Sequence, residues 1–224
     1  MNSRTKSKII FAAVLAVALA LHGQGVVWTG WTAADTNAGT ASGTMGGVTV
    51  NYSGEVDQYS TVNNFGATYL WAPGSTFTNS LVPMLPGTSD IIRLGGGLGI
   101  TSTLTFSTPV NDLIIDITSV GSISGTTNSF IFNQPFTILS QGGDYWRTNG
   151  TGCWLSASGN TLTGVEGSGC LYFSGPISSL SWTIPRKEMD AGFTVGMLGV
   201  PEPGTVSICL LGATTLALCR RRRG

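Results

Sequence analysis

Two neighbouring runs of alternating residues decide the fold class: Leu104-Thr105-Phe106-Ser107-Thr108-Pro109-Val110 and Asp112-Leu113-Ile114-Ile115-Asp116-Ile117. Successive side chains of a β-strand point to opposite faces, so an apolar residue at every second position predicts one buried face. In the first run, Leu104 and Phe106 share a face with the preceding Ile100, and threonine and serine lie opposite. In the second run, the apolar face holds Leu113, Ile115 and Ile117. The two runs therefore predict two strands that border one core.

The same period of two recurs through residues 26–199, and a long 3.6-residue period does not. Glycine and proline separate the runs at intervals of about 8–12 residues, a spacing typical of sandwiches. We therefore predict an all-β fold, a single jelly-roll-like β-sandwich domain. Ala33–Gly47 is small and polar, which fits either a loop or a weak edge strand. Further strands are expected at Val26–Trp31, Gly47–Tyr52, Ala67–Trp71, Asp90–Leu94, Phe130–Phe132, Phe136–Ile138, Leu162–Val165, Gly169–Phe173, Leu180–Ile184 and Phe193–Met197.

The charges are distributed unevenly, although the whole chain has 11 basic and 11 acidic residues. Seven of the 11 basic residues lie in the end segments, residues 1–25 and 200–224. Ten of the 11 acidic residues lie in the central region, residues 26–199. The central region therefore carries a net charge of about −6, which opposes the binding of phosphate backbones. We expect no nucleic-acid partner.

Four cysteines divide by location into two pairs. Cys209 and Cys219 lie in an apolar run near the C-terminal end, where they fit as small apolar residues. Cys153 and Cys170 lie in the central region. The basic and apolar segments at the two ends, residues 4–21 and 206–223, indicate export to an oxidising compartment, where disulfides persist. A disulfide between Cys153 and Cys170 is expected, and two separate buried thiols are the alternative.

Most catalytic arrangements lack a required residue. The chain has one histidine, His22, and it lies in the N-terminal segment 1–25, outside the central region. This excludes Ser-His-Asp and Cys-His nucleophile sites and His-ligated zinc from the central region. The glycine run Gly95–Gly97 is not followed by the helix that a phosphate-binding turn requires.

Paired carboxylates leave two kinds of chemistry open. Glu55 and Asp57 lie two residues apart, as do Glu188 and Asp190, so each pair would share one face of a strand. A glycosidase needs two such acids across a cleft, and a surface calcium site would use the same oxygen ligands. Solvated turn residues are the simpler interpretation. We therefore expect no enzyme activity, no cofactor and no metal.

Aromatic residues provide the other candidate binding site. Tyr145, Trp146 and Trp154 gather near the expected disulfide loop. Exposed aromatic rings with hydroxyl and amide neighbours suit sugar rings, whose apolar faces stack on them. The alternative is that tryptophans fill the sandwich core, as the alternation predicts for Trp182.

The C-terminal segment combines three features in a fixed order. Pro201, Glu202 and Pro203 form a stiff extended motif, because proline fixes φ and lacks an N–H group. A 14-residue apolar run, Val206–Cys219, follows and predicts a transmembrane helix of about 21 Å. Four arginines come next and favour the cytoplasmic side of a membrane. They are Arg220, Arg221, Arg222 and Arg223.

This segment resembles the PEP-CTERM sorting signal of Gram-negative bacterial proteins, in which Pro-Glu-Pro precedes a transmembrane segment and a terminal arginine cluster. The resemblance covers about a tenth of the chain, residues 200–224. It implies processing by exosortase, a membrane-embedded transpeptidase-like enzyme. It also implies a membrane-held intermediate and delivery to the cell surface, the outer envelope or the extracellular polymer matrix.

The N-terminal segment also indicates export. Arg4, Lys6 and Lys8 precede the apolar run Ile9–Leu21, and Ala18-Leu19-Ala20 offers a signal-peptidase site. We assign residues 1–25 to a helical signal peptide, 26–199 to the sandwich and 200–224 to the sorting signal. The expected function is structural or adhesive, at the surface or in the matrix. A carbohydrate-binding module for exopolysaccharide is the first alternative, and a carboxylate-dependent glycosidase is the second.

Overall fold

The computed structural model describes residues 25–64, 68–122, 124–147, 149–188 and 191–199 of the chain. Residues 26–198 form one compact unit. Most of the predicted signal peptide, the Pro-Glu-Pro motif, the apolar run 206–219 and the arginine cluster lie outside the described residues. Within the described ranges, no helix is both long and apolar enough to cross a membrane.

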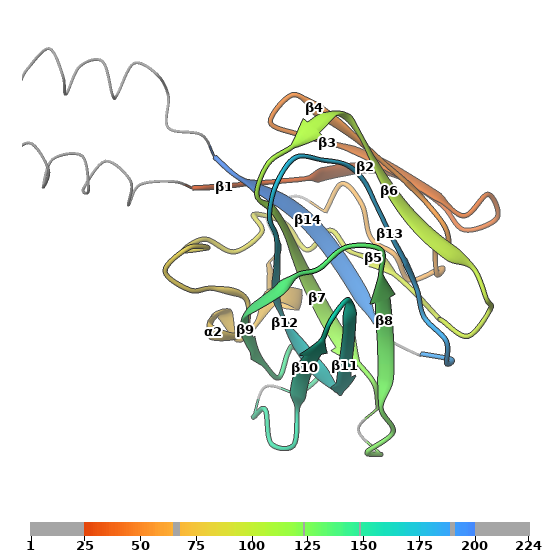
Figure 1. Cartoon of the computed structure of the whole chain (residues 1–224), viewed down its shortest axis with the longest axis vertical. Coiled ribbons are helices and arrows are strands. Elements are labelled where there is room, and N and C mark those ends of the chain that lie inside the picture. The colour runs from red at the N-terminus through yellow and green to blue at the C-terminus, as the bar shows by residue number, and fades with distance from the viewer. Residues whose placement is uncertain (1–24, 65–67, 123, 148, 189–190, 200–224) are drawn as a thin grey trace, which may run out of the picture. The chain divides into compact units, whose positions relative to one another are not determined.

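The described residues are almost entirely β-structure, arranged in two antiparallel sheets as expected of a sandwich (Figure 1). Sheet A has six strands, five of them in one path and β5 paired with β14. In spatial order they are β1 (Val26–Trp28), β14 (Gly192–Leu198), β7 (Leu113–Val120), β12 (Gly167–Phe173) and β9 (Thr137–Gly142), with β5 (Ile92–Arg93) at the side.

Sheet B has eight strands, and every pairing in it is antiparallel. In spatial order they are β10 (Trp154–Ser158), β11 (Thr161–Val165), β8 (Asn128–Phe132), β13 (Ile177–Thr183), β6 (Thr101–Val110), β4 (Val48–Ser53), β3 (Thr40–Met45) and β2 (Gly30–Asp35). Two single-turn helices, η1 (Tyr69–Trp71) and α2 (Gly74–Phe77), lie in the long connection between β4 and β5.

The main core contains the inward-facing apolar residues of both sheets. Phe193 of β14 lies at its centre, with ring centroids 5.1 Å from Trp182, 5.3 Å from Tyr52 and 6.1 Å from Trp31. Trp182 is 3% exposed, which confirms the core position that its alternation predicts.

The outer face of sheet A is also covered, so β7 is buried on both sides. Leu113, Ile115 and Ile117 face the main core, as the alternation predicts. Ile114 belongs to a second apolar cluster with Val82, which the β4–β5 connection brings onto this face. A strand buried on both faces has no solvent side, and this explains why all eight residues of β7 are buried.

Two predicted strands differ from the observed structure, and one open alternative is resolved. Val26–Trp31 is not one strand, because it is divided between β1 of sheet A and β2 of sheet B. Ala33–Gly47 forms most of a hairpin, β2 and β3, so the edge-strand interpretation is confirmed for it. Ala67–Trp71 is not a strand, because Tyr69–Trp71 forms a 3-10 helix. The indole of Trp71 is fully buried there, and its Nε1 donates to the carbonyl of Thr88 at 2.8 Å.

Strand limits differ at two further places. β6 runs through Pro109 to Val110, although proline lacks the N–H needed for a sheet ladder. Its partner strand β13 changes register between Ile177 and Ser179, and this irregularity accommodates the proline. β10, at Trp154–Ser158, is a strand at a place where the sequence pattern predicts none.

Candidate functional site

Four exposed aromatic rings and one arginine form a continuous group on the surface. The Arg93 guanidinium carbon lies 5.4 Å from the Tyr59 ring centroid and 5.5 Å from that of Trp146. Trp146 contacts Tyr145 at 5.7 Å, and Tyr145 contacts Tyr69 at 5.2 Å. The four rings are 40–61% exposed. We call these five residues the aromatic cluster.

The Tyr59 end of the aromatic cluster is fixed to sheet A. The Asp57 carboxylate accepts a hydrogen bond from the Tyr59 backbone N–H at 2.8 Å and so forms the turn that carries the ring. The backbone N–H of Asp57 donates to the carbonyl of Arg93, and the backbone N–H of Arg93 donates to Ser60 Oγ. These bonds hold Tyr59 beside β5, where Arg93 can lie over its ring.

Tyr145 and Trp146 are carried by a tight loop that follows β9. A Cβ atom at Gly143 would collide with the carbonyl oxygen of Arg147, so the loop requires glycine there. Thr76 of α2 donates from its hydroxyl to the Gly143 carbonyl at 2.6 Å, in a buried bond. The loop is therefore anchored at its base while its two aromatic rings remain exposed.

Asp144 links this loop to sheet A. Its Oδ1 accepts the backbone N–H groups of Trp146 at 3.0 Å and of Arg147 at 3.3 Å, and its Oδ2 accepts the Ser168 hydroxyl at 2.7 Å. Asp144 is fully buried. Desolvation raises the pKa of its carboxyl, although the Ser168 and backbone hydrogen bonds act in the opposite direction. Asp144 is thus a positioning residue for Trp146.

Asp144→Ala is expected to lower the free energy of unfolding by about 1–3 kcal/mol, since it leaves buried donors without an acceptor. It is also expected to make the Trp146 loop more sensitive to limited proteolysis. Asp35→Ala is the matched control, because Asp35 Oδ1 accepts two backbone N–H groups in the same way but in an exposed turn. Urea denaturation compares the two variants, and equal losses would contradict a special role for Asp144.

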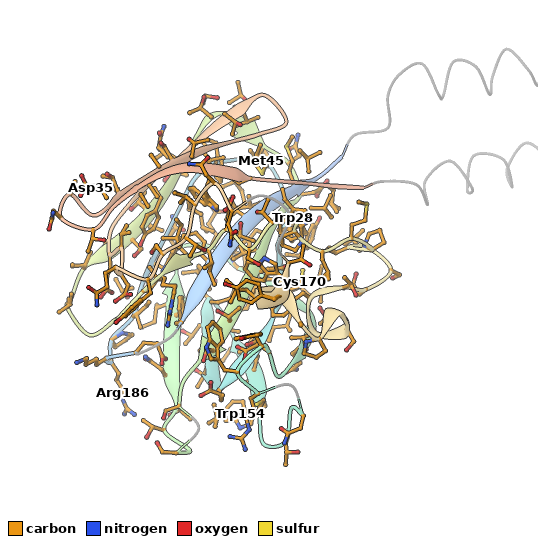
Figure 2. All side chains as sticks on the ribbon, turned by 180° about the vertical axis from the view of Figure 1, so that it is seen from behind. Trp28, Asp35, Met45, Trp154, Cys170 and Arg186 are labelled. Carbon is orange, nitrogen blue, oxygen red and sulfur yellow. The ribbon has the colours of Figure 1, made fainter. Side chains whose placement is uncertain are left out.

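The structure separates the three aromatic residues singled out from the sequence. Tyr145 and Trp146 lie together, and Tyr59, Tyr69 and Arg93 join them from distant segments. Trp154 begins β10 and is 38% exposed, but among the described residues it makes no ring contact with the cluster. In Figure 2 it is labelled near the β10 end of the molecule.

The expected disulfide is not formed, and both Cys153 and Cys170 are free. Cys153 lies in the turn that precedes β10, whereas Cys170 is buried on the outer face of sheet A beside Ile114 and Val82. Burial raises the pKa of both thiols. Protonated thiols are poor nucleophiles, so these two are in unreactive settings.

Asp116 is a second buried carboxyl group, at the centre of sheet A. In the sheet register it lies between Cys170 of β12 and Thr194 of β14. It is fully buried, and no N–H or O–H group of the described residues donates to either oxygen. Desolvation raises its pKa well above the ordinary value of 3.8, and the neighbouring Cys170 thiol opposes this only weakly.

The raised pKa of Asp116 makes stability depend on pH. Below pH 3.8 the carboxyl is protonated in both the folded and the unfolded chain. Above that pH the unfolded chain ionises first, so the free energy of unfolding falls by up to about 1.4 kcal/mol per pH unit until the folded pKa is reached.

Asp116→Asn is expected to remove the fall in the free energy of unfolding that Asp116 causes as pH rises. The gain in stability over the wild type is therefore expected to be largest at alkaline pH. Urea denaturation between pH 4 and 9 measures the slope. Asp144 contributes a slope of the same sign in both proteins, so the difference between them isolates Asp116. Identical slopes for the two proteins would contradict the assignment.

The other predicted carboxylates support the backbone. Glu55 Oε2 accepts the backbone N–H of Gly96 at 2.6 Å. Glu188 Oε2 accepts the backbone N–H of Gly121 at 2.8 Å and the amide of Asn128 at 3.1 Å. Asp190 lies outside the described residues. In the part of the chain that the structure describes, no group of three or more His, Cys, Asp or Glu side chains is placed to hold a metal ion.

Comparison with known proteins gives one match. The model of the PEP-CTERM protein-sorting motif matches residues 199–223. No curated protein and no solved structure matches the chain. The matched region includes Pro201, Glu202, Pro203 and the four arginines, and it implies exosortase-dependent sorting, export and passage through the membrane towards the cell surface. The chain therefore carries the sorting signal of PEP-CTERM proteins, as its C-terminal sequence predicts.

Proposed function

We propose that the exported domain has an adhesive role and holds extracellular polysaccharide through the aromatic cluster. The observation that carries the proposal is the continuous contact between Tyr59, Arg93, Trp146, Tyr145 and Tyr69 on the surface of the sandwich. The proposal includes no catalysis, and the carboxylates of Glu55, Asp57 and Glu188 accept backbone hydrogen bonds.

The physical support comes from the exposed rings. A soluble domain usually buries its large aromatic residues, and a group of exposed rings marks an interaction surface. The C–H face of a sugar ring removes apolar area from water when it lies on an aromatic ring, while tyrosine hydroxyls offer hydrogen bonds at the rim. The buried side chain of Asp144 and the bonds around β5 pre-order these rings, which reduces the entropy lost on binding.

The sorting signal also supports polysaccharide as the class of ligand. A protein passed through the membrane to the surface is placed among envelope and matrix polymers, and polysaccharide is abundant there. The charge of about −6 on the central region disfavours polyphosphate and strongly acidic polymers. A neutral or weakly acidic polysaccharide fits both conditions.

Trp146→Ala is expected to weaken binding to the producing cell's purified exopolysaccharide by about tenfold or more, because truncating a central aromatic hot spot costs about 2 kcal/mol and tenfold corresponds to about 1.4 kcal/mol. Affinity electrophoresis in gels that contain the polymer measures the change. Trp154→Ala is the matched control, because Trp154 is equally exposed but lies outside the cluster. Unchanged retardation of Trp146→Ala and Tyr145→Ala would refute the proposal.

A further inference from the structure

The solvent face of sheet B carries rows of small uncharged polar side chains across neighbouring strands. The register places Ser42 opposite Asn51, Asn51 opposite Thr105, and Thr105 opposite Ser179. The next row runs through Thr40, Ser53, Thr103 and Ser181. Unlike the outer face of sheet A, these rows are solvent-accessible: each of their side chains is exposed or half-buried.

A groove of about 580 Å³ lies over the β2, β3, β4 and β6 part of this face. It is within the size range of small-ligand sites, about 300–1,000 Å³. Asp35 marks one end at the tip of the β2–β3 hairpin, where Figure 2 labels it. The outward-facing residues that line the groove are Ala33, Asp35, Thr40, Ser42, Asn51, Ser53 and Thr105.

The chemistry of the groove differs from that of the aromatic cluster. Its polar side chains are hydroxyls, one amide and one carboxylate, and it contains no lysine or arginine. Hydroxyl and amide groups both donate and accept hydrogen bonds, as the hydroxyls of a sugar chain do. With one carboxylate, no cation and a negatively charged domain around it, the groove complements an uncharged chain and repels an anionic one.

The groove and the aromatic cluster share no residue. The groove lies on the outer face of sheet B, whereas Arg93 of the cluster belongs to β5 of sheet A, and Tyr69 and the Trp146 loop lie with η1 and α2 beside that sheet. Two sites on different sheets can engage two polymer chains at once. Such bivalency raises retention by avidity and can connect separate chains.

We infer that the groove on sheet B is a second glycan site, specific for a neutral polysaccharide, and that the protein cross-links chains between this site and the aromatic cluster. The cross-linking part of the inference rests on the proposed function of the aromatic cluster. The groove itself is an independent site with its own residues.

The test uses the processed protein recovered from the producing cells, shown to be monomeric by light scattering. Hydroxyethyl cellulose is the neutral probe, and carboxymethyl cellulose is the anionic probe with the same backbone. Asn51→Lys places a long charged side chain in the groove on an exposed strand position. Ser156→Lys is the matched control, because it makes a comparable change on exposed β10 of the same sheet.

The wild-type protein and Ser156→Lys are expected to raise the turbidity of hydroxyethyl cellulose, and Asn51→Lys and Trp146→Ala are each expected to reduce that rise at least about tenfold. Carboxymethyl cellulose is expected to give a much weaker rise. Titration with cellohexaose should give two sites in the wild-type protein and one site in each of these two variants. Thermal denaturation verifies that every variant is folded.

The possible failures point to different claims. One site in the wild-type protein, or Asn51→Lys behaving like the wild type, would overturn the groove as a glycan site and leave the aromatic cluster intact. If titration of Trp146→Ala with cellohexaose still gave two sites, the aromatic cluster would not be a glycan site. No binding of either neutral probe by the wild-type protein would overturn the inference as stated for neutral glucans.

Discussion

Glu202→Ala is expected to leave most of the protein as unprocessed precursor in the membrane fraction. Because proline fixes φ, the sequence predicts that the two prolines present the glutamate in an extended conformation to the processing enzyme. Removing that charge is expected to lower the processed fraction by about tenfold, equivalent to about 1.4 kcal/mol of recognition. Immunoblots of membrane, surface and medium fractions measure the ratio of precursor to product. Thr205→Ala, just outside the motif, is the matched control.

Deleting Arg220–Arg223 tests the same sorting signal from its other end. Without the cationic cluster, the apolar run loses the residues that favour a cytoplasmic end, so the precursor is expected to be mislocalised. Normal processing of both the deletion and Glu202→Ala would contradict the assignment of the segment as a sorting signal.

Phe193→Ala is expected to destabilise the sandwich by about 3–5 kcal/mol. Phe193 of sheet A is 1% exposed, and its ring contacts three aromatic rings of the opposite sheet B. They are Trp31, Tyr52 and Trp182. Its truncation therefore opens a cavity where the two sheets meet. A domain of this kind has a total stability of about 5–15 kcal/mol, so the loss is a large fraction of it.

Urea denaturation measures the loss, and Ile131→Ala is the control. Ile131 is also a large apolar residue on a strand, but it is 43% exposed on β8. Its truncation is expected to change stability by no more than about 0.5 kcal/mol. Equal effects of the two substitutions would show that Phe193 is not a central core residue.

The alternating runs were sufficient to predict an all-β chain with two packed sheets, because one-sided burial produces a period of two. The alternating runs do not predict which strands are buried on both faces of a sheet. In β7, Ile114 and Asp116 are buried as well, since the β4–β5 connection covers the outer face of sheet A. That cover depends on a long, irregular segment whose path no local pattern encodes.

Local pattern also failed where tertiary contacts decide the conformation. Tyr69 and Trp71 favour strands by propensity, but burial of the Trp71 indole and its bond to Thr88 stabilise a 3-10 turn. The small residues of Ala33–Gly47 carry little hydrophobic signal, but the pairing of β3 with β4 and of β2 with β3 makes them strands.

The aromatic site could be found only in part from the sequence. Tyr145 and Trp146 are adjacent, so their grouping was visible, whereas Tyr59, Tyr69 and Arg93 come from three other segments. The sequence groups Trp154 with Tyr145 and Trp146 because it lies close to Trp146 along the chain, beside the expected disulfide loop, but the β10 strand places it elsewhere. The expected disulfide failed for a similar reason, because spacing and compartment do not reveal that Cys170 lies on the outer face of sheet A next to Asp116.

Retention of the protein in the matrix of living cells tests the central claim most directly. Cells that produce wild-type protein, Trp146→Ala or Trp154→Ala are washed, and the protein left on the extracellular polymer is quantified by immunoblot. The account predicts that the wild type and Trp154→Ala stay with the polymer, whereas processed Trp146→Ala is lost to the medium by about tenfold or more. Equal retention of all three processed proteins would contradict it.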